Sequence, residues 1–319
     1  MDHGAAFYRN YFLINALERY TNSLQEFMLW RRGSFLPPHK KNAYVKNFVE
    51  EEQERFHTQG FFSLPSVQFA ITTRCTLRCR DCSVMIPRFA KSGAGHQEMS
   101  FDRFRENLDS LLGAVDHIRS LLILGGEPLL HKELADMVAY AASQEKIGLV
   151  DVVTNCTIVP SEDLLAAIAP YRHKVFFGLS NYTQNPDAAK IVRRDEIIAL
   201  LKAHDIKHSL DTGTGKWFRY SLEECDLDAE AIKSVFAGCQ WHHCLYVLGD
   251  ELAVCPRSLV GEKLGAYALD ADDKVRLPGQ DAATLRNRLM AFFAKDTLDA
   301  CRYCHRHEEL VEPAIQLAH

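Results

Sequence analysis

The sequence predicts an α/β fold in which parallel strands alternate with helices, flanked by a helical N-terminal extension and a small C-terminal domain. Two observations support this. From Ser66 onward, short apolar runs alternate with helical patterns, which is typical of parallel βα units. Cysteines cluster directly after the first apolar run and again in the last third of the chain. At 319 residues, the chain is long enough for one large domain with appendages or for two domains.

The N-terminal segment predicts helices. Between Phe7 and Met28, apolar side chains recur mainly at three- and four-residue steps, as on an amphipathic helix. A charged segment from Lys46 to Arg55 predicts a second, solvated helix. We interpret residues 1–65 as a helical cap on the main domain; an arm that binds a partner or a leader peptide is the alternative.

We expect residues 66–215 to form the main domain. Ser161 precedes Glu162-Asp163, which gives a helix N-cap followed by acidic residues in the first turn. Parallel sheets place ligand sites at the carboxyl ends of their strands. The predicted strands are Val67–Ile71, Leu121–Leu124, Val150–Thr154, Val175–Ser180 and Ile206–Leu210, and the predicted helices are Phe101–Leu112, Glu133–Ser143, Glu162–Ile168 and Asp187–Ala203.

The composition is that of a globular protein, with 47% hydrophobic and 25% charged residues and a net charge of −5. A general nucleic-acid surface would be basic, so no nucleic acid is expected as a partner. No apolar stretch approaches the roughly 20 residues of a membrane-spanning helix, and the N-terminus lacks the layout of a signal peptide. We therefore expect a cytoplasmic protein without a membrane partner, in which ten cysteines favour metal sites over disulfides.

Three cysteines with the spacing C-x3-C-x2-C follow the first predicted strand directly: Cys75, Cys79 and Cys82. Iron–sulfur cubanes normally take four thiolates, so three thiolates leave one iron open to a small molecule. The second predicted strand ends in the sequence Gly125-Gly126-Glu127-Pro128.

Together these motifs resemble the radical S-adenosylmethionine (SAM) superfamily. The resemblance implies a partial (β/α)6 barrel, a 4Fe–4S cluster on the three cysteines, and contact of Gly125, Gly126, Glu127 and Pro128 with the methionine end of SAM, Glu127 accepting from its ammonium. It also implies reductive cleavage of SAM to a 5′-deoxyadenosyl radical, with an electron donor such as flavodoxin or ferredoxin. One position departs from the family, which often has an aromatic residue where Asp81 precedes the third cysteine.

Polar residues follow the third and fourth predicted strands. By position, Asn155, Ser180 and Asn181 are candidates to bind the SAM carboxylate or ribose, although Asn and Ser also favour ordinary turns. Cys156 stands where related radical SAM proteins often have glycine. It is a candidate hydrogen-atom donor, with Cys225 as a second candidate; the alternative is a small residue buried in a packed turn.

Five further cysteines lie after a connecting segment, residues 216–234, whose start we expect to line the site. Residues 245–254 predict a hairpin around Gly249-Asp250, and Leu285–Phe293 predicts a helix. Residues 235–319 resemble the SPASM or Twitch extension of radical SAM enzymes, which implies an auxiliary 4Fe–4S cluster. Its ligands would be Cys255, Cys301, Cys304 and either Cys239 or Cys244.

Zinc is the competing interpretation of this C-terminal region, because cysteines and histidines in these spacings also suit tetrahedral coordination. The histidines concerned are His242, His243, His305 and His307.

The resemblance is strongest to compact radical SAM enzymes that oxidise or epimerise a carbon of a sugar, so a small, sugar-like substrate is expected. Modification of a ribosomal peptide is the alternative enzymatic function. A non-catalytic iron–sulfur or zinc protein is an alternative of another class.

Overall fold

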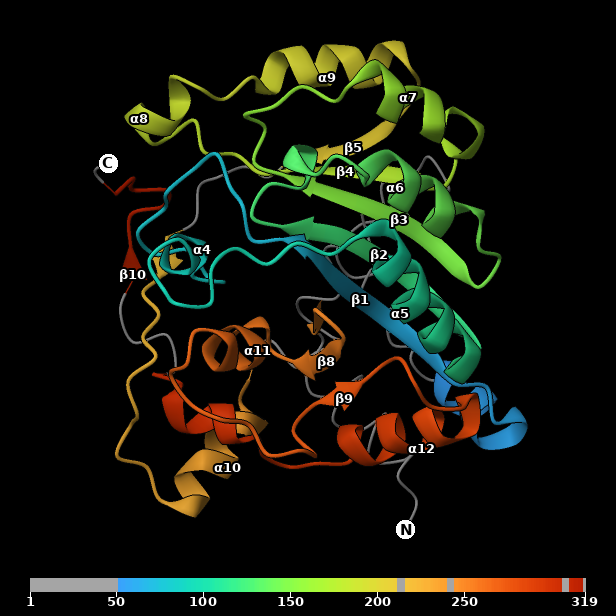
Figure 1. Cartoon of the computed structure of the whole chain (residues 1–319), viewed down its shortest axis with the longest axis vertical. Helices are drawn as coiled ribbons and strands as arrows, with labels where there is room; N and C mark the ends of the chain where they lie inside the picture. Colours follow the sequence, from blue (N-terminus) through green and yellow to red (C-terminus); the bar gives the residue numbers. More distant parts are fainter. Residues whose placement is uncertain (1–50, 211–215, 240–243, 306–309, 318–319) are drawn as a thin grey trace.

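The computed structural model describes residues 51–210, 216–239, 244–305 and 310–317 (Figure 1). An eight-stranded sheet with the order β5-β4-β3-β2-β1-β7-β8-β9 forms its centre. β1 to β5 and β7 run parallel, whereas β8 and β9 are antiparallel to their neighbours. The strands are β1 Ser63–Thr72, β2 His117–Gly125, β3 Ile147–Thr154, β4 Val175–Leu179, β5 Lys207–Leu210, β7 Leu245–Leu248, β8 Glu251–Val254 and β9 Val275–Arg276, and β6 Trp217–Phe218 pairs separately with β10 Leu310–Val311.

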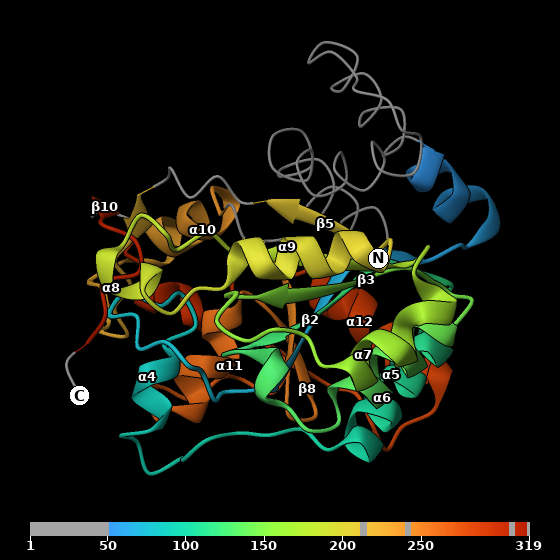
Figure 2. The ribbon, with the colours of Figure 1, turned by 90° about the horizontal axis from the view of Figure 1, so that it is seen from above.

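Helices cover the outer face of this curved sheet (Figure 2). Along that face α6 packs between α5 and α7, and α12 packs on α5. The fold is thus α/β with a mixed, mostly parallel sheet, which is consistent with the expected partial radical SAM barrel. The helices are α4 Ile86–Phe89, α5 Phe101–Ala114, α6 Leu134–Ser143, α7 Glu162–Ile168, α8 Pro186–Ala189, α9 Arg194–Ala203, α10 Ala229–Ala237, α11 Pro256–Lys263 and α12 Ala282–Phe293, with 3-10 turns at Pro128–Leu130, Ala169–Tyr171 and Asp299–Tyr303.

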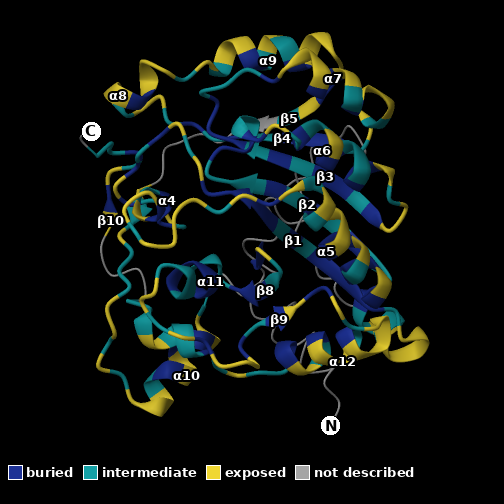
Figure 3. Ribbon diagram, viewed as in Figure 1, coloured by how far each residue is buried: buried dark blue, intermediate teal, exposed yellow. Residues whose placement is uncertain are grey.

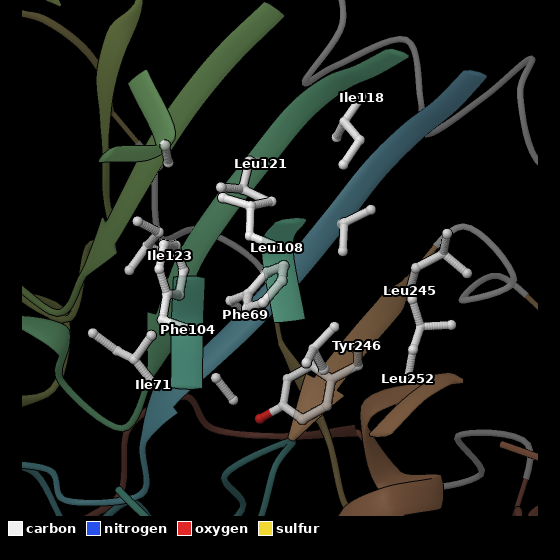
Figure 4. Packing of buried hydrophobic residues seen from close by; sticks show 14 of the residues in the cluster. Phe69, Ile71, Phe104, Leu108, Ile118, Leu121, Ile123, Leu245, Tyr246 and Leu252 are labelled. Atoms are coloured by element: carbon white, nitrogen blue, oxygen red, sulfur yellow. The ribbon is translucent and has the colours of Figure 1, made fainter. Parts of the chain in front are cut away.

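The main core lies between the sheet and these helices. Alternate side chains of β1 point toward α5, where Phe69 packs edge-on against Phe104 with ring centroids 5.1 Å apart (Figure 4). Leu108 and Leu121 complete this contact and are, like both rings, fully buried. Burial is concentrated along the strands and the inward faces of the helices (Figure 3).

The predicted strands and most predicted helices are confirmed, including Glu162–Ile168 with Ser161 as its N-cap. The helix predicted over 187–203 is two helices, α8 and α9. They are separate because the backbone N–H of Arg193 donates to the Cys156 carbonyl at 2.7 Å instead of to a carbonyl within a continuous helix. Long-range hydrogen bonding therefore overrides local helical periodicity here.

The predicted hairpin is also confirmed, with its turn at Gly249, where φ is 61°. Its first strand, β7, pairs in parallel with β1 and so becomes the sixth parallel strand of the main sheet. The sequence did not indicate this pairing, because nothing local to residues 245–248 specifies a partner almost 180 residues earlier in the chain.

Of the predicted N-terminal helices, the structure describes only residues 51–59, which are helical; residues 1–50 lie outside the described residues. In the part of the chain that the structure describes, no helix is long and apolar enough to cross a membrane.

The glycine pair at the end of β2 packs directly against the end of β1. Gly126 donates its N–H to the Thr72 carbonyl and Glu127 donates to the Arg74 carbonyl, each at 2.8 Å. A Cβ on Gly125 would lie 2.1 Å from the Thr72 oxygen, and one on Gly126 would lie 2.1 Å from the Arg74 oxygen. Only glycine fits at this contact, which fixes where the cysteine loop begins.

Replacing Gly126 by alanine is expected to destabilise the fold by about 1–3 kcal/mol, because the new methyl group meets a backbone carbonyl that cannot move aside cheaply. Urea unfolding of the full chain measures this. Gly113→Ala, whose methyl would meet only the Ala282 methyl group at 3.7 Å, is the matched control and is expected to be neutral or stabilising. Equal stability of both variants would contradict this account of the contact.

Candidate active site

A cavity of about 500 Å³ opens at the carboxyl ends of the parallel strands. The cysteine loop after β1 forms one wall, the ends of β2 and β3 form the floor, and the residues around β6 form the opposite wall. This is the position that the sequence predicts for a ligand site in a parallel sheet. The lining includes Gln68, Cys75, Cys79, Asp81, Cys82, Gly125, Gly126, Asn155, Ser180, Tyr182, Lys216, Trp217, Phe218, Tyr220, Cys244 and Tyr246.

Each of the three loop thiols receives N–H donors. Leu77 N and Asn155 Nδ2 both lie 3.4 Å from Cys75 Sγ, and Gln316 Nε2 lies 3.3 Å from Cys79 Sγ. Such donors stabilise thiolates over thiols, which fits these residues to the cluster that the sequence predicts.

Without a metal, burial dominates the acidity of these thiols. It raises the pKa of Cys75 to about 12 and that of Cys79 to about 11, despite the donors of Leu77 and Gln316. Burial also raises the pKa of Cys82, against the backbone N–H groups of residues 84–86. A coordinating metal deprotonates thiols outright, so an iron site here would release protons on loading.

Glu127 lies behind the cavity wall and is fully buried. Its carboxylate accepts from Thr154 Oγ1 at 2.9 Å, from Asn155 N at 2.8 Å and from Leu129 N at 3.1 Å. It thereby ties the end of β2 to the end of β3. Burial raises its pKa to about 7, only partly offset by these donors. Of the four residues predicted to contact SAM here, Gly125 and Gly126 line the cavity, whereas Glu127 and Pro128 do not.

Of the polar candidates after β3 and β4, Asn155 and Ser180 line the cavity, whereas Asn181 does not. Asn155 also contacts Thr76 Oγ1 at 3.1 Å, so its amide braces the cysteine loop. Asn181 is turned toward Thr183, whose backbone N and Oγ1 donate to its side-chain oxygen at 3.1 and 2.6 Å.

Neither predicted hydrogen-atom donor lines the cavity. Cys156 is fully buried in the main core, with its Sγ 3.8 Å from the Thr154 carbonyl. Its φ is 64°, a conformation in which glycine is favoured. Cys225 lies beside the C-terminal 3-10 turn, where its backbone N–H donates to the Arg302 carbonyl at 2.7 Å.

The start of the connecting segment forms the wall opposite the cysteine loop, as predicted. Trp217 packs edge-on against Tyr182, with ring centroids 5.5 Å apart. The buried carboxylate of Asp81 pairs with Arg80 Nε at 2.8 Å and with Arg219 Nε at 3.6 Å. This ion pair links the cysteine loop to the aromatic wall at the position where the family often has an aromatic residue.

A second, smaller cavity of about 30 Å³ lies between α10, α11 and the C-terminal 3-10 turn. Four thiols line it: those of Cys239, Cys255, Cys301 and Cys304. Burial raises the pKa of Cys301, and repulsion from the other three sulfurs raises it further. Cys244, in contrast, lines the large cavity. Four grouped thiols are a donor set that fits a 4Fe–4S cluster.

Arg257 stands between the two cavities. Its guanidinium lies 3.8 Å from Cys304 Sγ on one side and 4.4 Å from the centre of the Tyr220 ring on the other. Burial acts to lower the pKa of this group, but the sulfurs of Cys255 and Cys304 outweigh it and hold the pKa above its usual value. The side chain therefore places a positive charge beside the four thiols and packs against the wall of the large cavity.

Of the residues in the zinc alternative, the five C-terminal cysteines and His305 fall within the described residues. His305 Nε2 lies 3.3 Å from the Glu223 carbonyl, while His242, His243 and His307 lie outside them. Over residues 51–210, 216–239, 244–305 and 310–317, no three Cys, His, Asp or Glu side chains surround a single point as the ligands of one metal ion do.

Residues 69–216 match the family model of the Radical SAM superfamily. In structure, the chain is similar to Streptococcus suis SuiB bound to S-adenosylmethionine (TM-score 0.35, 15% identity, covering 55% of this chain and 38% of SuiB). It is also similar to anSMEcpe with bound AdoMet and Cp18Cys peptide (TM-score 0.33, 20% identity, covering 46% of this chain and 42% of anSMEcpe). A third similar structure is BtrN in complex with AdoMet and 2-DOIA (TM-score 0.43, 15% identity, covering 80% of this chain and 97% of BtrN). The match thus spans about two fifths of the SuiB and anSMEcpe chains.

Residues 69–216 are therefore a radical SAM domain, the core of radical SAM enzymes. The domain contains the three loop cysteines and the glycine pair, and the large cavity lies at the ends of its strands.

Sequence reasoning missed the contribution of the C-terminal residues to this site. β10 pairs with β6, and residues 314–317 run alongside the cysteine loop, where Cys79 and Gln316 form an antiparallel bridge. Only Pro313, a residue that often precedes a turn or an edge strand, hinted at a structured end.

Glu127 gives the site a pH-dependent stability. Because its pKa is raised in the folded state, its contribution to the free energy of unfolding is fully present below pH 4.5 and is lost as the pH rises through about 7. The loss is about 3 kcal/mol at most. Glu127→Gln should remove this dependence, so its stability deficit relative to the wild type should shrink between pH 4.5 and 8.

Urea unfolding at a series of pH values measures this difference. Glu106→Gln, on the exposed face of α5, is the control and should follow the wild-type pH profile. A Glu127→Gln deficit that is constant across the pH range would contradict the burial effect.

Proposed function

We propose that this protein is a radical SAM enzyme that removes a hydrogen atom from a carbon of a small, sugar-like substrate and thereby oxidises or epimerises it. The observation that carries the proposal is that one cavity joins the three loop thiols and the glycine pair to an aromatic wall. When bound, the cluster and SAM supply a 5′-deoxyadenosyl radical, which needs its substrate within the same water-poor space.

The wall opposite the cysteine loop supports a small polar substrate. The cavity of about 500 Å³ would have to hold the cluster and SAM as well, which leaves room only for a small substrate. Trp217, Phe218 and Tyr220 offer flat apolar faces for C–H groups, whereas Gln68 and Lys216 offer polar atoms for hydroxyl groups. The residues of this chain would bind and orient the substrate and exclude water.

The four thiols of the small cavity support an auxiliary 4Fe–4S cluster with Cys239, rather than Cys244, as the fourth ligand. Cys244, which lines the large cavity, is then not a ligand of the auxiliary cluster. If the reaction is an epimerisation, Cys244 is better placed than Cys156 or Cys225 to return a hydrogen atom to the substrate.

Iron and sulfide content after anaerobic reconstitution tests the two-cluster proposal. The wild type should hold roughly eight irons, and the Cys75/Cys79/Cys82→Ala variant about four. Reduced wild type should release 5′-deoxyadenosine from SAM, and the variant should release none. Release by the variant would overturn the radical SAM assignment; about four irons falling to none, with zinc present, would overturn the auxiliary cluster.

Single substitutions distinguish the two alternatives for the fourth ligand. Cys239→Ser should lower iron below eight per chain toward four, whereas Cys244→Ser should keep about eight. Iron loss in Cys244→Ser with full content in Cys239→Ser would reverse the assignment.

The Cys244→Ser variant also tests hydrogen return. In D2O, an epimerase should place deuterium on the product carbon, and Cys244→Ser should abolish this while Cys156→Ala retains it. The opposite pattern would return the donor role to Cys156.

A further inference from the structure

Residues 314–317 run antiparallel to part of the cysteine loop and join it through one isolated β-bridge, between Gln316 and Cys79. Arg80 N donates to the Ile315 carbonyl at 2.8 Å, and Leu317 N donates to the Arg78 carbonyl at 2.9 Å. Ala314 is fully buried against Leu77 and Cys79. Figure 1 shows the C-terminal end on the side of the sheet where the parallel strands end. The loop is thus held by backbone bonds on both sides, to the glycine pair and to the C-terminal residues.

We call residues 314–317, together with their bonds to the cysteine loop, the clamp. Gln316 makes its central contact, through both the oxygen and the nitrogen of its side-chain amide. Its oxygen accepts from Arg78 N at 2.7 Å, which fixes the orientation of the group. Its nitrogen then faces Cys79 Sγ at 3.3 Å and also donates to the Ala314 carbonyl. The amide is therefore preorganised to present an N–H group to one particular sulfur.

We infer that Gln316 is a positioning residue for the radical SAM cluster, holding the Cys79 thiolate in place and raising the cluster's reduction potential through an N–H···S hydrogen bond. Hydrogen bonds to the sulfurs, net charge and exposure to solvent set such potentials. A donor stabilises the reduced state, which carries one more negative charge. Asn155 provides the equivalent contact to Cys75 from the opposite side of the loop. This inference rests on the proposed function, because it requires the cluster on the loop thiols.

Two substitutions distinguish the effect of the Arg78 contact from the effect of the N–H donor to Cys79. Gln316→Glu keeps an oxygen for Arg78 N but replaces the donor by a carboxylate oxygen. Gln316→Leu removes both contacts at similar volume. Gln280→Glu, the same change at a half-buried site whose amide contacts the Arg276 carbonyl, is the control.

The experiment is a redox titration of the reconstituted full-length variants followed by electron paramagnetic resonance, in which the cluster on the loop is recognised by its response to SAM. Both Gln316 variants should have a more negative midpoint potential than the wild type and Gln280→Glu. We expect at least a tenfold change in the equilibrium constant for reduction, which is 59 mV for one electron. Gln316→Glu should shift further than Gln316→Leu, because it also adds a negative charge.

A wild-type potential in both variants would overturn this inference alone. Iron loss in Gln316→Leu with an unshifted potential in Gln316→Glu would leave Gln316 a purely structural role and would also overturn it. If the wild type gives no SAM-responsive signal, the proposed function fails, and this inference fails with it.

Discussion

The contact between the end of β2 and the end of β1 is the constraint on which the site depends. Two backbone hydrogen bonds join the glycine pair to the residues that enter the cysteine loop. No side chain fits between the glycine pair and residues 72–74 at this point. The position of the first thiol relative to the cavity floor is therefore set by the main chain. Glu127 extends the same contact to β3, so three neighbouring strand ends form one unit.

Side-chain N–H groups add a second layer of support from distant parts of the chain. Asn155 directly follows β3, Gln316 is one of the C-terminal residues, and each reaches a different sulfur of the loop. The Asp81–Arg219 pair ties the loop to the wall that the substrate would face. A change at any of these positions would alter both the geometry of the thiols and the electrostatic field around them.

The sequence predicted those parts of the structure that depend on local pattern. Strand and helix periodicity, the Ser161 cap and the glycine turn of the hairpin are local signals, and the structure confirms them. The grouping of the cysteines followed from their spacing and from the family resemblance. What could not be predicted depends on long-range pairing: β7 beside β1, the break between α8 and α9, and the contact of Gln316 with Cys79. The proposal of Cys239 over Cys244 as a cluster ligand also depends on the fold, because both cysteines precede the hairpin in sequence but line different cavities.

The clamp on the cysteine loop also sets an order of events during protein synthesis. Gln316 lies 237 residues after the sulfur that it contacts, so the ribosome makes the loop long before the residues that brace it. Over that interval the three thiols belong to a partly folded chain with an unsupported loop. Chains fold from the N-terminus as they emerge, and contacts of such sequence separation form late. Insertion of iron into a correctly shaped site would therefore have to follow the synthesis of Gln316. Before that point the loop thiols are most exposed to oxidation.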